Sequence, residues 1–111
     1  MNYVSGDFVA RILQELQQRS GVLTADEAAH LANRSKSRVR HAFTRHAGRN
    51  FRTARMHVKL ERGRALLLET RLSIPEISTL LQYSDRSKFD TAFKRAYQLT
   101  PKAYRQLHGQ R

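Results

Sequence analysis

The chain has 111 residues, enough for one domain or two small subdomains, and it contains no cysteine. These facts exclude a multidomain enzyme, a disulfide framework, thiolate metal sites and cysteine nucleophiles. Lysine and arginine total 21 against 9 aspartate and glutamate, and the resulting net charge of +12 favours a polyanionic partner, nucleic acid first. No apolar stretch approaches the roughly 20 residues of a membrane span, and the N-terminus lacks a signal pattern, so we expect a soluble, unexported chain.

Helices are predicted from apolar residues at helical spacing and from capping residues. They are expected near residues 7–18, 25–32, 36–47, 52–70, 74–81, 86–97 and 101–107. Candidate N-caps precede six of them: Asp7, Thr24, Ser35, Ser73, Asp85 or Ser84, and Thr100. Thr24 with Glu27, and Ser73 with Glu76, have the spacing of capping boxes. No window alternates like a strand, so the predicted fold class is all-α.

The positive charge is concentrated in the middle of the chain. Residues 34–64 carry eleven basic residues against Glu61 alone, whereas residues 1–33 carry two basic and four acidic residues. Apolar residues recur at helical spacing inside the basic segment, first Val39, Ala42, Phe43 and His46, then Met56, Leu60, Gly63 and Leu67. The basic side chains are therefore expected on amphipathic helices and not on a disordered tail.

Residues 24–46 and 73–96 resemble one another. Matches at an offset of 49 include Thr24, Glu27, Leu31 and Ser35 with Ser73, Glu76, Leu80 and Ser84; matches at an offset of 50 include Val39, Ala42, Phe43 and Arg45 with Phe89, Ala92, Phe93 and Arg95. Each unit has a short capped helix, a connector and a longer helix, the layout of a helix-turn-helix. One such pair could arise in many helical proteins, but two in tandem beside many basic residues favour DNA binding.

The repeat predicts two helix-turn-helix subdomains, 1–50 and 71–111, joined by a connecting helix over 51–70. That helix would be up to about 28 Å long. A helix of this length could act as a rigid connector between two recognition helices. It would hold them about one DNA turn apart, about 34–36 Å, so that they enter successive major grooves. Because the two units are covalently joined and differ in sequence, we expect a monomer on an asymmetric site.

The two longer helices each have an apolar side and a polar side. The apolar side of the first helix carries Val39, Ala42, Phe43 and His46, and that of the second carries Phe89, Ala92, Phe93 and Ala96. Core packing explains the aromatic rings on these apolar sides better than base stacking does. The opposite sides carry groups that can bond base edges or phosphates. The candidate DNA-binding residues are Lys36, Ser37, Arg38, Arg40, His41, Thr44, Arg45, Arg86, Ser87, Lys88, Thr91, Lys94 and Arg95.

The two helices differ at equivalent positions, since Arg40 corresponds to Asp90 and Thr44 to Lys94. Arg40 can bond a guanine through two hydrogen bonds. Asp90 is unfavourable near phosphates unless it accepts from a cytosine amino group or pairs with Arg86 four residues earlier, and we favour the pair. The first unit is thus expected to contribute more base specificity and the second more phosphate anchoring.

Several stretches together resemble the DNA-binding domain of the AraC/XylS family of bacterial transcription regulators, over about residues 7–106. The most specific are Leu72-Ser-Ile-Pro-Glu-Ile, Tyr83-Ser-Asp-Arg-Ser-Lys-Phe89, Ala92-Phe-Lys-Arg95, Leu99-Thr-Pro101 and Tyr104-Arg105. The chain has no room for a separate ligand-sensing domain, so it resembles the stand-alone MarA/SoxS type, or a domain of a longer regulator. The resemblance implies an activator that binds specific double-stranded DNA and recruits RNA polymerase in the bacterial cytoplasm, associated with the nucleoid.

The chain departs from the family pattern at three places. Gln82 and Gln98 stand where glycine or a small residue is usual, and Ala54-Arg55 replaces an aromatic-aliphatic pair. If either glutamine needs a positive φ, it adopts it at a cost. Asn33, in the turn of the first unit, tolerates the left-handed conformation well.

Other functions are less well supported by the residues. A metal site is not expected, because His41 and His46 are five apart and no cysteine is present. No catalytic set stands out, so we predict no enzyme and no cofactor. The alternatives are a cationic helical module that binds RNA or an anionic membrane without sequence preference, and a module in which one unit binds DNA weakly and the other a protein. The tandem caps and turns favour specific DNA binding over these alternatives, because charge-driven binding needs neither. We therefore expect no membrane partner.

Overall fold

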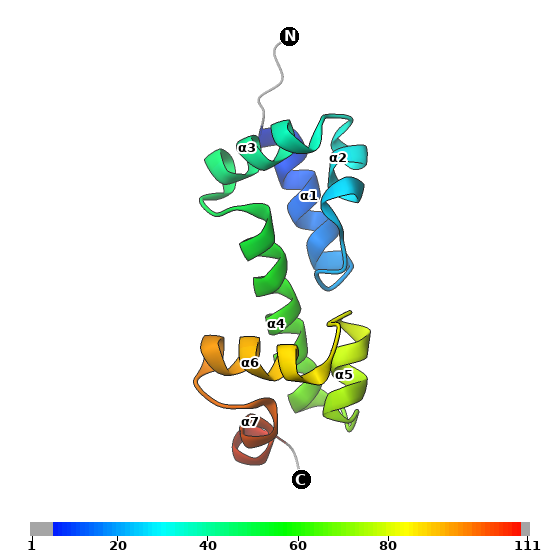
Figure 1. Cartoon of the computed structure of the whole chain (residues 1–111). Helices are drawn as coiled ribbons and strands as arrows, with labels where there is room; N and C mark the ends of the chain where they lie inside the picture. The colour runs from blue at the N-terminus through cyan, green and yellow to red at the C-terminus, as the bar shows by residue number, and fades with distance from the viewer. Residues whose placement is uncertain (1–5, 110–111) are drawn as a thin grey trace. The chain divides into compact units, whose positions relative to one another are not determined.

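The computed structural model describes the backbone of residues 6–109 and the side chains of residues 8–109. Within that range the chain forms seven helices and no strand, which confirms the all-α prediction (Figure 1). The helices are α1 (Gly6–Gln18), α2 (Ala25–Ala32), α3 (Lys36–Ala47), α4 (Phe51–Glu69), α5 (Ile74–Leu80), α6 (Arg86–Tyr97) and α7 (Pro101–His108). Every boundary lies within one residue of its prediction. Asp7, the predicted cap of the first helix, lies inside α1, and its side chain is outside the described residues.

Side-chain caps explain where most of the helices begin. In both capping boxes the two reciprocal hydrogen bonds are present: the Glu27 amide donates to Thr24 Oγ1 at 3.0 Å, and the Thr24 amide donates to Glu27 Oε1 at 2.8 Å. Ser35, Asp85 and Thr100 each accept a hydrogen bond from the amide three residues later. Of the two candidate caps of α6, it is therefore Asp85 and not Ser84 that caps the helix. Asn50, which was not predicted as a cap, caps α4 by accepting from the Thr53 amide at 2.8 Å.

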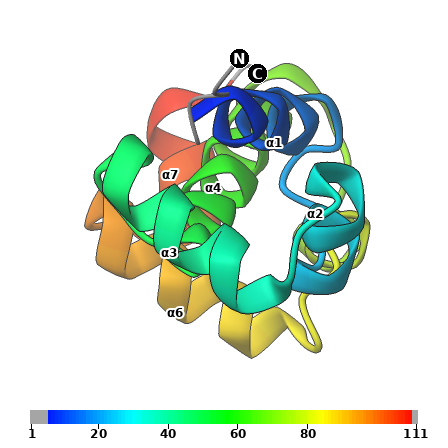
Figure 2. The same ribbon diagram turned by 90° about the horizontal axis from the view of Figure 1, so that it is seen from above.

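Among the described residues, those up to Val58 and those from Lys59 onward form two compact units, each with its own core. Buried residues of α1, α2, α3 and the first half of α4 form the core of the first unit, and Figure 2 shows the ribbons of these helices from above. Phe43 of α3 is fully buried there and meets Phe51 edge to face, with ring centroids 5.6 Å apart. The apolar side of α3 therefore fixes that helix on the unit.

The second unit repeats this plan with α5, α6, α7 and the end of α4. Phe89 and Phe93 of α6 are fully buried, and their ring centroids lie 5.7 Å apart. Phe93 also meets Tyr104 of α7 edge to face at 5.4 Å. The aromatic side chains of α6 thus bind it to its neighbours on the side opposite its polar residues.

The helix α4 contributes to both cores. Phe51, Ala54 and Val58 are buried in the first, and Leu60, Leu66 and Leu67 in the second. Met56 was predicted on the stripe with Leu60, but 43% of it is exposed. Met56 belongs to neither buried cluster, and the stripe of the second core begins at Leu60.

The turn residues adopt the backbone conformation that the sequence suggested. Asn33, Gln82 and Gln98 have φ values of 54°, 60° and 71°, in the left-handed region. Asn33 and Gln82 correspond at an offset of 49, while the N-caps Ser35 and Asp85 correspond at 50. The extra residue of the second unit therefore lies in the turn, between the left-handed residue and the N-cap, and Ser35 corresponds to Asp85 rather than to Ser84.

Candidate nucleic-acid interface

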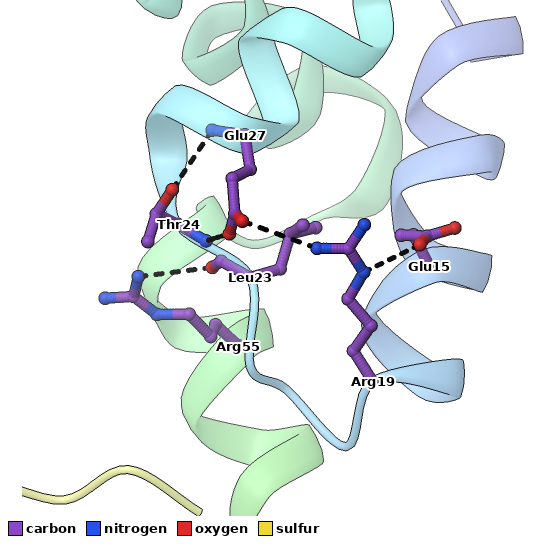
Figure 3. Close-up of polar contacts among 6 residues, drawn as sticks. All are labelled: Glu15, Arg19, Leu23, Thr24, Glu27 and Arg55. Atoms are coloured by element: carbon purple, nitrogen blue, oxygen red, sulfur yellow. Dashed lines mark hydrogen bonds and ion pairs between the residues drawn. The ribbon is translucent and has the colours of Figure 1, made fainter.

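Polar contacts hold the start of α2 in place within the first unit. Arg19 bridges two carboxylates, with Nε 2.7 Å from Glu15 Oε2 and Nη1 3.5 Å from Glu27 Oε2 (Figure 3). The same close-up shows Arg55 of α4 donating from Nη1 to the Leu23 carbonyl at 3.4 Å. Helices α1, α2 and α4 are thus linked by polar contacts around the capping box.

All of the candidate DNA-binding side chains are exposed. On α3 they are Lys36, Ser37, Arg38, Arg40, His41, Thr44 and Arg45; on α6 they are Arg86, Ser87, Lys88, Thr91, Lys94 and Arg95. Val39 and Phe43 on α3, and Phe89 and Phe93 on α6, are buried beneath them. Each recognition helix therefore presents a continuous polar side to solvent.

The last turn of each recognition helix packs differently from the prediction. His46 and Ala96 were placed on the apolar sides, but both are exposed. The residues that follow them, Ala47 and Tyr97, pack against the two cores instead. Since the correction is the same in both units, the repeat extends to the ends of the two helices.

Two open hollows flank α3 in the first unit. One, of about 420 Å³, is lined by Phe8, Ser35, Ser37, Arg38, His41, Ala42, Arg45 and His46. The other, of about 510 Å³, is lined by Ser37, Arg40, His41, Thr44 and Arg45. Ser37, His41 and Arg45 line both, so they form the ridge between the hollows. A ridge with a basic hollow on each side offers donors to base edges at its crest and to phosphates beside it.

Some candidate side chains on α3 already have protein partners. The Lys36 ammonium lies 3.2 Å from Asp26 Oδ1 of α2, in an exposed ion pair. The Thr44 hydroxyl donates to the Arg40 carbonyl at 3.0 Å, so its oxygen keeps only acceptor capacity toward a ligand. Thr44 can therefore accept from a base amino group more readily than it can contact a phosphate.

On α6, the predicted pairing of Arg86 with Asp90 is present. Arg86 Nε lies 3.4 Å from Asp90 Oδ2, in the i, i+4 arrangement of a helix surface. The other oxygen, Oδ1, is buried and has no hydrogen-bond partner among the described residues. Asp90 is the only acidic residue of α6, and α3 has none.

The acidic residues with perturbed ionisation lie away from the two recognition helices. Hydrogen bonds from the Thr24 backbone and side chain lower the pKa of Glu27, and the corresponding bonds from Ser73 lower the pKa of Glu76. Both carboxylates therefore stay ionised at the first turns of α2 and α5, where negative charge is favourable for the helix dipole. Positive charge remains dominant on α3 and α6.

Arg105, which the sequence indicated only as part of a family motif, has a structural role. Its guanidinium donates from Nε to the Leu67 carbonyl at 3.0 Å and from Nη1 to the Leu72 carbonyl at 2.6 Å. Nη2 reaches the carbonyls of Thr70 at 3.2 Å and Leu66 at 3.5 Å. Arg105 thus caps the C-terminal end of α4 and fastens α7 to it.

Neither a metal site nor a membrane span is found in the part of the chain that the structure describes. No three histidine, aspartate or glutamate side chains gather there as ion ligands would. None of its helices is both long enough and apolar enough to cross a bilayer.

Two capped helix pairs, each with a buried aromatic side and an exposed basic side on its second helix, define a tandem helix-turn-helix protein. A family model described as a helix-turn-helix domain matches residues 28–107. The chain belongs to this AraC-type family of DNA-binding transcription regulators, as the resemblance had implied. It is 33% identical over 88 residues to the xylose operon regulatory protein of Escherichia coli, a match that covers 79% of this chain and 22% of the relative.

Solved structures agree with this assignment. The C-terminal domain of AraT, a response regulator from Geobacillus stearothermophilus, superposes with a TM-score of 0.85 at 28% identity, covering 95% of this chain and 88% of that one. The DNA-binding domain of AdpA, solved in complex with a target DNA, shares the fold with a TM-score of 0.76 at 18% identity, covering 93% and 90%. The chain spans about a fifth of the length of the xylose regulator.

Proposed function

We propose that the chain binds a specific sequence of double-stranded DNA as a monomer, with α3 and α6 as recognition helices in successive major grooves. The observation that supports this most is the exposure of every candidate side chain on both helices while the aromatic sides of the same helices are buried. A helix-turn-helix presents its second helix to the groove in this way. The proposed contacts are the candidate residues named on α3 and α6.

The two helices would divide the contacts unequally. Arg40 on α3 is exposed and carries the planar fork that reads a guanine through two hydrogen bonds. Lys88, Lys94 and Arg95 on α6 are exposed cations suited to phosphates, which carry no sequence information by themselves. The first unit would therefore contribute more of the base specificity, and the second more of the anchoring.

We further propose that the bound chain activates transcription by contacting RNA polymerase, at the bacterial nucleoid in the cytoplasm. This role follows from the family resemblance. In vitro transcription from a promoter carrying the selected site, with purified polymerase, tests it: added protein should raise the yield of transcript, and a decrease would indicate a repressor.

The competing function is charge-driven binding to RNA or to an anionic membrane, which the net charge of +12 would also support. Selection from a random duplex pool separates the two. The selected duplex should bind about 10³-fold more tightly than random duplex at physiological salt. Log K should fall against log salt with a slope of about −0.9 for each phosphate contact. Equal affinity for random duplex, RNA and anionic vesicles would contradict specific DNA binding.

The monomer is tested on the same duplex by analytical ultracentrifugation. One chain for each selected site is expected, and the selected site should lack two-fold symmetry. Two chains at a palindromic site would show that the units do not read the DNA in tandem.

A further inference from the structure

Asp90 occupies an unusual place for a carboxylate. It is the only acidic residue on either recognition helix, and on α6 its charged neighbours are Arg86, Lys88, Lys94 and Arg95. Negative charge on a surface that contacts phosphates weakens binding to every duplex, so a carboxylate there needs a role that offsets the repulsion. We propose that Asp90 is a positioning residue that orients Arg86, and that Arg86 reads one guanine in the major groove. This inference rests on the proposed function of α6 as a recognition helix.

The two carboxylate oxygens argue against direct reading of DNA by Asp90 itself. Oδ2 faces Arg86, 3.4 Å from its Nε. Oδ1 is covered by the protein and has no partner among the described residues. Only Oδ2 is left for an amino group of cytosine, and a contact there would compete with the Arg86 guanidinium for the same oxygen. The pair with Arg86 is therefore the role that the geometry favours.

The pairing leaves the two Nη groups of Arg86 available to contact a base. With Nε turned toward Asp90, the two Nη groups make no bond to the rest of the described chain, and 48% of the Arg86 side chain is exposed. Two parallel N–H donors match the O6 and N7 acceptors of guanine. Arg86 is also the first residue of α6, and the N-terminal residues of a recognition helix are those that contact base edges.

The equivalent residue of the first unit shows the contrast. Lys36 is the first residue of α3, and its ammonium lies 3.2 Å from Asp26, which belongs to the neighbouring helix α2. A lysine has no planar fork, so fixing its position does not prepare two parallel hydrogen bonds. Lys36 suits a phosphate, whereas Arg86 held by Asp90 suits a base. The second unit would thus add one base contact to its phosphate anchors.

The test measures dissociation constants of the full chain for the selected duplex and for each of its single-base-pair variants at one salt concentration. The variants are Arg86→Ala, Asp90→Asn and the double substitution, with Glu69→Gln as a control that removes the same charge from α4. Arg86→Ala should reduce discrimination at one G·C pair by about 5- to 150-fold. Asp90→Asn should reduce it at the same pair by at least about threefold, and the double variant should lose no more than Arg86→Ala.

A second readout separates positioning from a structural role. Asp90→Asn should bind random duplex more tightly than the wild type, because it removes a negative charge beside phosphates, while Glu69→Gln should leave the base preferences unchanged. If Asp90→Asn melts at a lower temperature, Asp90→Glu, which keeps the charge, should restore part of the discrimination. Unchanged discrimination in Asp90→Asn, or a change at a different base pair, would overturn the orienting role alone. A wild-type chain without any preferred duplex would overturn the proposed function as well.

Discussion

The backbone of Gly63 in α4 lies directly against the ring of Phe89 in α6. A Cβ atom added to Gly63 would lie 3.0 Å from Cε1 and 3.1 Å from Cζ of Phe89. The same atom would lie 3.1 Å from Cδ1 of Leu81. Phe89 is fully buried and Leu81 is 1% exposed, so both side chains would have to shift within the core to admit the added atom. The close approach of α6 to α4 therefore depends on Gly63 having no side chain.

Gly63→Ala is accordingly expected to destabilise the second unit. Overpacking of a dense core costs about 1–3 kcal/mol, which exceeds or offsets the gain of about 1 kcal/mol from replacing glycine inside a helix. Urea unfolding followed by circular dichroism measures the change. Arg62→Ala, at an exposed neighbouring position, should be nearly neutral. A more stable Gly63→Ala variant would mean that the helices can separate at no cost.

Gln82 and Gln98 should both gain stability when replaced by glycine. Each has a positive φ, which costs a residue with a side chain about 1–2 kcal/mol, and glycine recovers part of this after its own entropy cost, leaving about 0.5–1 kcal/mol. The gain should be smaller at Gln98, because its Nε2 donates to the Arg95 carbonyl at 3.3 Å and that bond is lost. Thermal unfolding measures both. Gln106→Gly, inside α7, is the matched control and should lose about 1 kcal/mol.

Arg105→Ala should destabilise the second unit by about 2–4 kcal/mol, because several partly buried carbonyls lose a charged donor. Arg105→Lys should recover only a part, since a lysine cannot reach carbonyls on both sides at once. Hydrogen exchange at the end of α4 provides the local measurement, with Lys102→Ala on the exposed side of α7 as the control. Equal protection in Arg105→Ala and wild type would show that α7 is held by its aromatic contacts alone.

Two variants, Arg40→Ala and Lys94→Ala, test whether the first unit contributes more base specificity and the second more phosphate anchoring. Arg40→Ala should relax preference at one or two base pairs, at about 1–3 kcal/mol of discrimination. Lys94→Ala should weaken binding to all duplexes about equally and flatten the salt slope by about one unit. The opposite pattern, with a uniform effect at Arg40 and a base-specific one at Lys94, would refute the proposed division.

The features that the sequence predicted well are those with local causes. Thr24 and Ser73 cap helices through bonds to residues three positions away, and such bonds leave a spacing that can be read directly. The buried rings of Phe43 and Phe93 followed from helical periodicity in the same way. Asn50 had the same kind of signal, an N-cap residue just before a predicted helix, and it could have been found.

The features that the sequence missed depend on distant residues. Arg105 caps carbonyls more than thirty positions earlier in the chain, and no local spacing encodes that contact. Met56 was misplaced because periodicity shows which face of a helix is apolar but not how far along it a core extends. His46 was wrongly predicted to pack against the core in the last turn of α3, because Ala47, one residue later, packs there instead.

The equal spacing of caps in the two units makes each recognition helix a transferable segment. Ser35 to Gly48 and Asp85 to Gln98 both run from an N-cap to a left-handed residue, at a constant offset of 50. The anchoring residues Val39, Phe43 and Ala47 correspond to Phe89, Phe93 and Tyr97 at the same offset. The outward residues can therefore be exchanged between the units while each keeps its own anchors. A chain assembled in this way, with one unit's reading surface on both helices, would be a starting point for engineering recognition of a repeated half-site by a single polypeptide.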